Sequence, residues 1–163
     1  GALIAAHPHL PASPAAADEA RRRLLRWRPA SPEHAALREY YLGVVAAASG
    51  DRAELAGRAA ALGRRGTPAD TAPAAVLARD LALALRARLA SRDDRREALA
   101  LLEQMHASPY REEWMALRSR CLERAMTAAL LREAGRADEA RAWEATIGES
   151  YFADLATARR PPR

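Results

Sequence analysis

Three short segments of the sequence share one pattern at an almost constant interval: Asp51-Arg52-Ala53-Glu54-Leu55, Asp94-Arg95-Arg96-Glu97-Ala98 and Arg136-Ala137-Asp138-Glu139-Ala140. From Leu55 to Ala98 is 43 positions, and from Ala98 to Ala140 is 42. A fixed period in this range is typical of helical units that stack on one another. Proteins of this kind most often serve as binding surfaces, so the repeat decides the architecture but not the partner.

The composition favours an all-α protein. Hydrophobic residues make up 50% of the 163 residues, mostly as alanine and leucine, while aromatic residues make up only 5%. The β-branched residues that favour strands are few. A chain of this length can bury a core as one domain of ordinary size.

Prolines, glycines and capping residues divide the chain into eight expected helices. Ser13-Pro14 and Ser31-Pro32 place a capping serine before a proline, which favours a helix start. Asp51 and Glu54 have the spacing of a capping box. The expected helices cover 13–27, 31–50, 51 to either 63 or 66, 73–91, 94–105, 108–135 and 136–147, with a short last helix from 150.

The expected domain organisation has three parts. We expect an irregular N-terminal segment at 1–12, a single domain of helical repeats at 13–158 and a basic tail at 159–163. Almost all connections within the domain are short, so consecutive helices should be antiparallel neighbours.

One spacing of glycine, small and apolar residues occurs at Leu42-Gly43, Ala46, Gly50-Asp51 and Leu55, and its second half recurs at Gly135 and Ala140. This spacing resembles the pattern of the tetratricopeptide-repeat family over roughly residues 31–148. The period is longer than the family's, which is about 34 residues. The resemblance implies an all-α solenoid of antiparallel helix hairpins with about seven or eight helices, used for protein–protein interaction. A plain antiparallel helical bundle remains the alternative.

The segment Gly135-Arg136-x-Asp138-Glu139-Ala140-Arg141-x-Trp143 resembles the last repeats of long bacterial regulators and kinases. This likeness implies that the chain is part of a larger bacterial regulatory or assembly protein. A cytoplasmic location is the corresponding expectation.

The positive charge has two interpretations. The net charge is +5, all 26 basic residues are arginine, and many arginines alternate with carboxylates. Arginine without lysine, together with the excess of alanine, is typical of a GC-rich coding bias, and a solvated face with ion pairs is the preferred interpretation. The alternative is a helical module that binds nucleic acid through one basic cluster, Arg21, Arg22, Arg26 and Arg28.

The sequence contains no pattern typical of an enzyme. Cys121 is the only cysteine, so neither an intrachain disulfide nor a thiolate zinc cluster can form. Adjacent carboxylates such as Glu112-Glu113 lie at expected helix starts, where negative charge favours the helix. Phosphate loops and nucleophile motifs do not occur. We therefore expect no enzymatic activity, no cofactor, no bound metal and no membrane span.

The resemblance to tetratricopeptide repeats also implies a binding face, because the first helix of each hairpin lines the concave side in that family. The matching residues here are Tyr40, Val44, Asp80, Leu83, Met126 and Arg132. The expected partner is another protein or peptide, or a neighbouring domain of the same polypeptide, in which case the chain could serve as a structural end-cap. The alternative is that a short array fills its own groove with these side chains.

Overall fold

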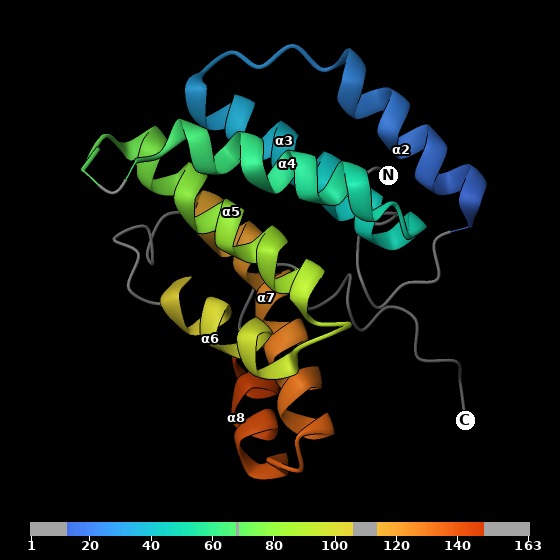
Figure 1. The fold of residues 1–163 in the computed structure, drawn as a ribbon, viewed down its shortest axis with the longest axis vertical. Helices are drawn as coiled ribbons and strands as arrows, with labels where there is room; N and C mark the ends of the chain where they lie inside the picture. The colour runs from blue at the N-terminus through green and yellow to red at the C-terminus, as the bar shows by residue number, and fades with distance from the viewer. Residues whose placement is uncertain (1–12, 68, 106–113, 149–163) are drawn as a thin grey trace. The chain divides into compact units, whose positions relative to one another are not determined.

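The computed structural model of the chain describes residues 13–67, 69–105 and 114–148. These residues form α-helices joined by short connections, and none of them lies in a strand (Figure 1). The helices are α2 (Pro14–Arg26), α3 (Pro32–Ser49), α4 (Arg52–Arg65), α5 (Pro73–Ala90), α6 (Arg95–Met105), α7 (Trp114–Glu133) and α8 (Ala137–Gly148). The predicted all-α fold is confirmed. The segments 1–12 and 159–163, the start of a helix at 108 and the last helix from 150 lie outside the described residues.

The helix starts follow the local capping chemistry that the sequence predicts. The Ser31 hydroxyl accepts a hydrogen bond from the His34 amide at 3.2 Å, and Ser13 does the same for Ala16. The Asp51 carboxylate accepts from the Glu54 amide at 2.9 Å. These side chains satisfy amide groups that have no partner inside the helix.

Two helix ends require glycine. Gly50 has φ of 80° and Gly135 has φ of 78°, in the left-handed region that side chains with a Cβ rarely adopt. After them, the Asp51 amide donates to the Ala46 carbonyl at 2.9 Å and the Arg136 amide to the Leu131 carbonyl at 2.8 Å. This is the Schellman arrangement, and it turns the α3–α4 hairpin within two residues and the α7–α8 hairpin within three.

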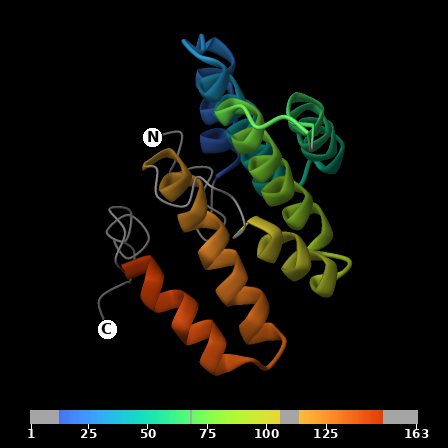
Figure 2. The same cartoon turned by 90° about the vertical axis from the view of Figure 1, so that its left-hand side faces the viewer.

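The chain divides into two compact units, Gly1–Arg111 and Glu112–Arg163. In the first unit, α3 packs on α4, α4 on α5 and α5 on α6, while α2 contacts α3. In the second unit, α7 and α8 form a hairpin, which Figure 2 shows as two neighbouring helices joined by a tight turn. The predicted hairpins α3–α4, α5–α6 and α7–α8 are therefore confirmed. The single domain expected over 13–158 stays a prediction.

The repeated column of small or apolar residues is buried, as the period predicts. Leu55 is 3% exposed, and Ala98 and Ala140 are fully buried. Seven positions further on, Leu62 and Met105 are also buried. A small residue at such a position lets two helices approach closely, because no long side chain separates their backbones.

At Gly43, α3 approaches α5 closely, and these are the first helices of successive hairpins. A Cβ built on Gly43 would lie 2.9 Å from Leu85 Cδ2 and closer still to Cδ1. Leu85 is fully buried, so its side chain has little room to move away. Gly43 is therefore required by packing, and not by its backbone conformation.

We expect Gly43→Ala to lower the free energy of unfolding by about 1–3 kcal/mol, because the added methyl group overpacks the contact with Leu85. Gly57→Ala is the matched control, since Gly57 lies in α4 and no atom lies within 4 Å of the position that an added methyl group would take there. The control should stabilise the protein by about 0.5–1 kcal/mol through helix propensity. Urea denaturation measures both, and equal effects of the two variants would contradict the close contact.

We expect Ala98→Arg to unfold the first unit, since a guanidinium at a fully buried position has neither space nor a partner; the loss should be at least about 3 kcal/mol. Ala100→Arg is the control in the same helix, because Ala100 is exposed. Circular dichroism on heating separates the two variants. An unchanged melting temperature for Ala98→Arg would mean that the buried face of α6 is misassigned.

Candidate functional site

Three of the residues predicted to form a concave binding face are inaccessible. Tyr40 is fully buried, Val44 is 2% exposed and Asp80 is 5% exposed. Because α3 and α5 pack directly on each other, the first helices of the hairpins bury this face instead of presenting it. These three side chains match the alternative interpretation, in which the helices fill their own groove. They do not form an exposed surface.

Tyr40 has a structural role between α3 and α5. Its hydroxyl lies 3.4 Å from Arg88 Nη2, which donates to it, and the Arg88 guanidinium lies 6.0 Å from the centre of its ring. The ring also meets Tyr41 edge to face, with centroids 5.2 Å apart. Arg88 is itself only 6% exposed. Replacing Tyr40 would therefore disturb the core, and it is unsuitable as a probe of binding.

Met126 and Arg132 lie in α7 of the second unit. Met126 is buried. Arg132 is exposed, and its Nη2 lies 2.6 Å from Glu144 Oε1. This ion pair joins α7 to α8 within their hairpin, so Arg132 already has a carboxylate partner in the chain.

Carboxylates of the same chain engage half of the predicted basic cluster. Arg21 Nη2 lies 3.1 Å from Glu54 Oε2, and both Arg22 and Arg23 pair with Glu19. Hydrogen bonds from Arg23 and Arg22 hold the pKa of the Glu19 carboxyl below its ordinary value. These pairs support the interpretation of a solvated face with ion pairs.

The other half of the cluster is open. Arg26 and Arg28 are exposed, and neither has a carboxylate partner within the described ranges. Two of the four predicted guanidinium groups are therefore open, and they form a smaller basic surface than the four that the sequence predicted.

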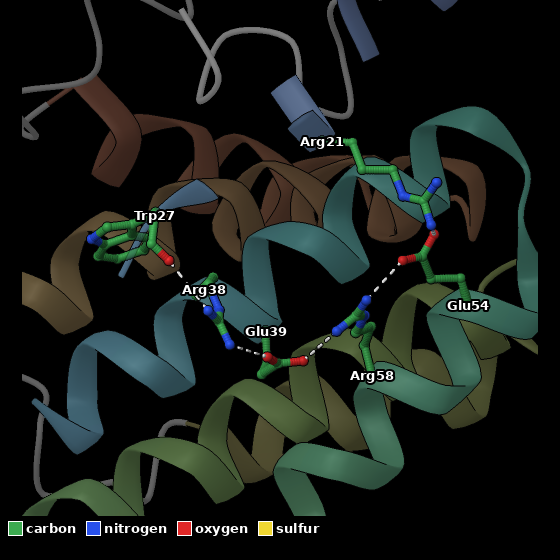
Figure 3. Close-up of polar contacts among 6 residues, drawn as sticks. All are labelled: Arg21, Trp27, Arg38, Glu39, Glu54 and Arg58. Carbon is green, nitrogen blue, oxygen red and sulfur yellow. Dashed lines mark hydrogen bonds and ion pairs between the residues drawn. The ribbon is translucent and has the colours of Figure 1, made fainter. Parts of the chain in front are cut away.

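Sequence reasoning missed a polar network centred on Glu39 of α3, drawn in Figure 3. Glu39 is 7% exposed. Its Oε2 accepts from Arg58 Nη1 at 2.6 Å, and its Oε1 accepts from Arg38 Nη2 at 3.4 Å. A buried carboxylate is tolerated because two guanidinium groups compensate its charge.

The network continues from this centre to α2 in both directions. Arg58 Nη2 donates to Glu54 Oε1 at 3.0 Å, and Glu54 also pairs with Arg21 of α2. On the other side, Arg38 Nη1 donates to the Trp27 carbonyl at 3.2 Å, just after α2 ends (Figure 3). Both ends of the network therefore attach α2 to the α3–α4 hairpin.

The ion pairs in the network stabilise the charged form of Arg58. Partial burial lowers the pKa of Arg58, but hydrogen bonds to Glu39 and Glu54 outweigh this effect and raise it. The guanidinium thus stays protonated at any physiological pH. Paired charges of this kind fix helices in place.

The first unit also carries an open groove of about 570 Å³ between α4 and α6, with α5 as its floor. Its described lining residues are small or apolar apart from two arginines and one glutamine, and none of them is a carboxylate. We refer to it as the α4–α5–α6 groove, and its lining residues are Ala56, Ala59, Ala60, Gly63, Gly66, Arg79, Ala82, Leu83, Arg86, Leu89 and Gln104. Of the residues predicted to bind a partner, only Leu83 lines it.

The two arginines of the groove differ in their contacts. Arg79 Nη1 donates to the Asp70 carbonyl at 2.8 Å and to the Thr67 carbonyl, so it ties the preceding loop to α5. Arg86 is exposed, and no carboxylate within the described part of the chain pairs with it. Arg86 is thus the cation that the groove offers to a ligand.

Two further properties concern only the described residues. No group of three or more histidine, cysteine, aspartate or glutamate side chains among them could hold a metal ion. None of the described helices combines the length and the apolarity that crossing a membrane would require.

No family model, no curated protein and no solved structure matches this chain. A function for the chain therefore has to be inferred from the geometry of the groove.

We expect Glu39→Ala to lower the free energy of unfolding by about 1–3 kcal/mol, because Arg38 and Arg58 lose the carboxylate that they share. Amide hydrogen exchange in α2 should become faster at the same time, since the network attaches this helix. Asp93→Ala is the control: it removes the exposed pair with Arg52 and should change stability much less. Equal losses in the two variants would show that burial of Glu39 has no energetic effect.

Proposed function

We propose that this chain is a protein–protein interaction module and that the α4–α5–α6 groove is its docking surface. The observation that carries the proposal is the groove itself, whose described lining is mainly apolar and includes the exposed Arg86 but no carboxylate. Small residues on α4 permit close approach of a partner's backbone. An open apolar groove between helices is the usual receptor for a helical segment.

The proposal includes a relationship to tetratricopeptide-like repeats in a larger bacterial protein that acts in the cytoplasm. It is supported by the consecutive hairpins, by Gly43 at the contact of successive first helices, and by burial of Ala98 and Ala140. The likeness of residues 135–143 to the last repeats of bacterial regulators supports the same origin. The groove is lined mainly by α4, the second helix of one hairpin, and by α5, the first helix of the next, so docking would differ from the concave-face binding first expected.

The alternatives have less support. A nucleic-acid module would use the cluster Arg21, Arg22, Arg26 and Arg28, of which the first two are paired with Glu54 and Glu19. Phosphate binding would have to compete with these carboxylates. An end-cap for a neighbouring domain is a special case of the proposal, in which the partner belongs to the same polypeptide.

Site-specific photocrosslinking in the cells of origin tests the docking surface. A photoreactive amino acid at Ala60, which lines the groove and is exposed, should capture one discrete protein. The same amino acid at Ala16 of α2 is the control, because Ala16 is equally exposed and lies outside the groove. Ala56→Trp, which fills the groove from an exposed position, should abolish capture at Ala60 while leaving the melting temperature unchanged.

Three results would contradict the proposal. The first is the absence of a discrete product at Ala60, and the second is capture that Ala56→Trp does not alter. The third is a nuclease-sensitive product from a photoreactive residue at Arg26 together with none from Ala60, which would favour the nucleic-acid alternative.

A further inference from the structure

The α4 and α5 residues that line the α4–α5–α6 groove have matching helical spacing. On α4 the lining residues Ala56, Ala60 and Gly63 recur at intervals of three and four. On α5 the lining residues Arg79, Ala82, Arg86 and Leu89 recur at the same intervals. Residues at these intervals form one face of a helix. A third helix that carries the same spacing can place its side chains between these two rows.

The size of the lining side chains specifies what such a helix must carry. Ala56, Ala60 and Gly63 leave the space above α4 empty, and Leu83 and Leu89 are only partly exposed at the floor. A helix that binds in the groove must therefore fill this space with large apolar side chains at intervals of three or four residues.

The charge of the groove specifies the polar side of the occupant. Arg86 is exposed between Leu83 and Leu89, and the described lining residues include no carboxylate to neutralise it. At the end of α4, Arg64 and Arg65 are also exposed and have no carboxylate partner among the described residues. Glu103 of α6 is exposed nearby in sequence but does not line the groove. The surface around the groove is therefore cationic, and an acidic ligand complements it.

A second copy of this chain fits the groove poorly. Each copy carries a net charge of +5, so two copies repel each other at long range. The same positive charge attracts an acidic segment of a different protein. A carboxylate of this segment can form a charge-assisted hydrogen bond with the Arg86 guanidinium.

We propose that the occupant of the α4–α5–α6 groove is an acidic amphipathic helix of another protein. Its large apolar side chains fill the space over Ala56, Ala60 and Gly63, and a carboxylate beside them pairs with Arg86. This inference rests on the proposed docking function and adds the chemical class of the partner.

Selection from a displayed library of random peptides tests the class of the partner. Peptides of about 20 residues are long enough to span a small domain as a helix. The library is selected on the full chain, and each enriched peptide is then measured against the wild type, Ala56→Trp, Arg86→Glu and Arg26→Glu. Arg26→Glu is the matched control, because Arg26 is an exposed arginine without a carboxylate partner in the described ranges and lies outside the groove.

We expect the enriched peptides to be acidic, with large apolar residues at intervals of three or four, and to lose binding to Ala56→Trp. Arg86→Glu should weaken them about tenfold or more, and Arg26→Glu much less. Replacing the carboxylate of the peptide with lysine should restore binding to Arg86→Glu.

The docking function and the acidic partner fail in different ways. If no enriched peptide depends on Ala56, the groove is not a docking surface and the proposed function fails with this inference. If the groove-dependent peptides are neutral or basic, or if Arg86→Glu has no more effect than Arg26→Glu, the acidic partner is wrong while the docking function stands.

Discussion

The direct contact between α3 and α5 is the constraint on which the first unit depends. Gly43 has no side chain, so α3 can approach Leu85 of α5 closely enough to exclude other atoms. Tyr40 and Val44 lie on either side of Gly43 in the sequence and become buried by the same approach. In this unit α3 and α5 are consequently held together by their own side chains.

The position of α5 follows from this contact and determines where a partner can dock. Because α3, α4 and α6 all pack on α5, only one strip of its surface remains partly open. This strip contains Leu83, Arg86 and Leu89, and it forms the floor of the α4–α5–α6 groove. The available surface thus combines this strip of α5 with the small residues of α4, because the face of α5 that meets α3 is used to stabilise the fold.

Arginine has three different roles in this lysine-free chain. Arg58 and Arg38 compensate the buried charge of Glu39, which fixes α2 on the α3–α4 hairpin. Arg22 and Arg23 form exposed pairs whose contribution to stability is small. Arg86 has no carboxylate partner among the described residues and faces the groove. A count of positive charges does not distinguish these roles, because each depends on what the guanidinium contacts.

The sequence by itself determined the helices, their ends and their pairing. Capping at Ser31 and Asp51 involves residues only three positions apart, and the turn at Gly50 depends on one backbone conformation, so both can be predicted locally. The hairpins follow from short connections. Burial of Ala98 and Ala140 follows from the repeat, since equivalent positions occupy equivalent environments.

Only the tertiary structure decided which faces of these helices remain accessible. In α3 the run from Glu39 to Ala46 is buried without interruption, so apolar periodicity cannot show which side chains meet a partner and which meet another helix. The pairing of Glu39 with Arg58 joins residues 19 positions apart, and the groove combines residues from three helices. Such contacts depend on how α4 and α6 pack around α5. The physical reason is that the spacing of residues along a helix determines which side chains share a face, but not which helix packs against that face.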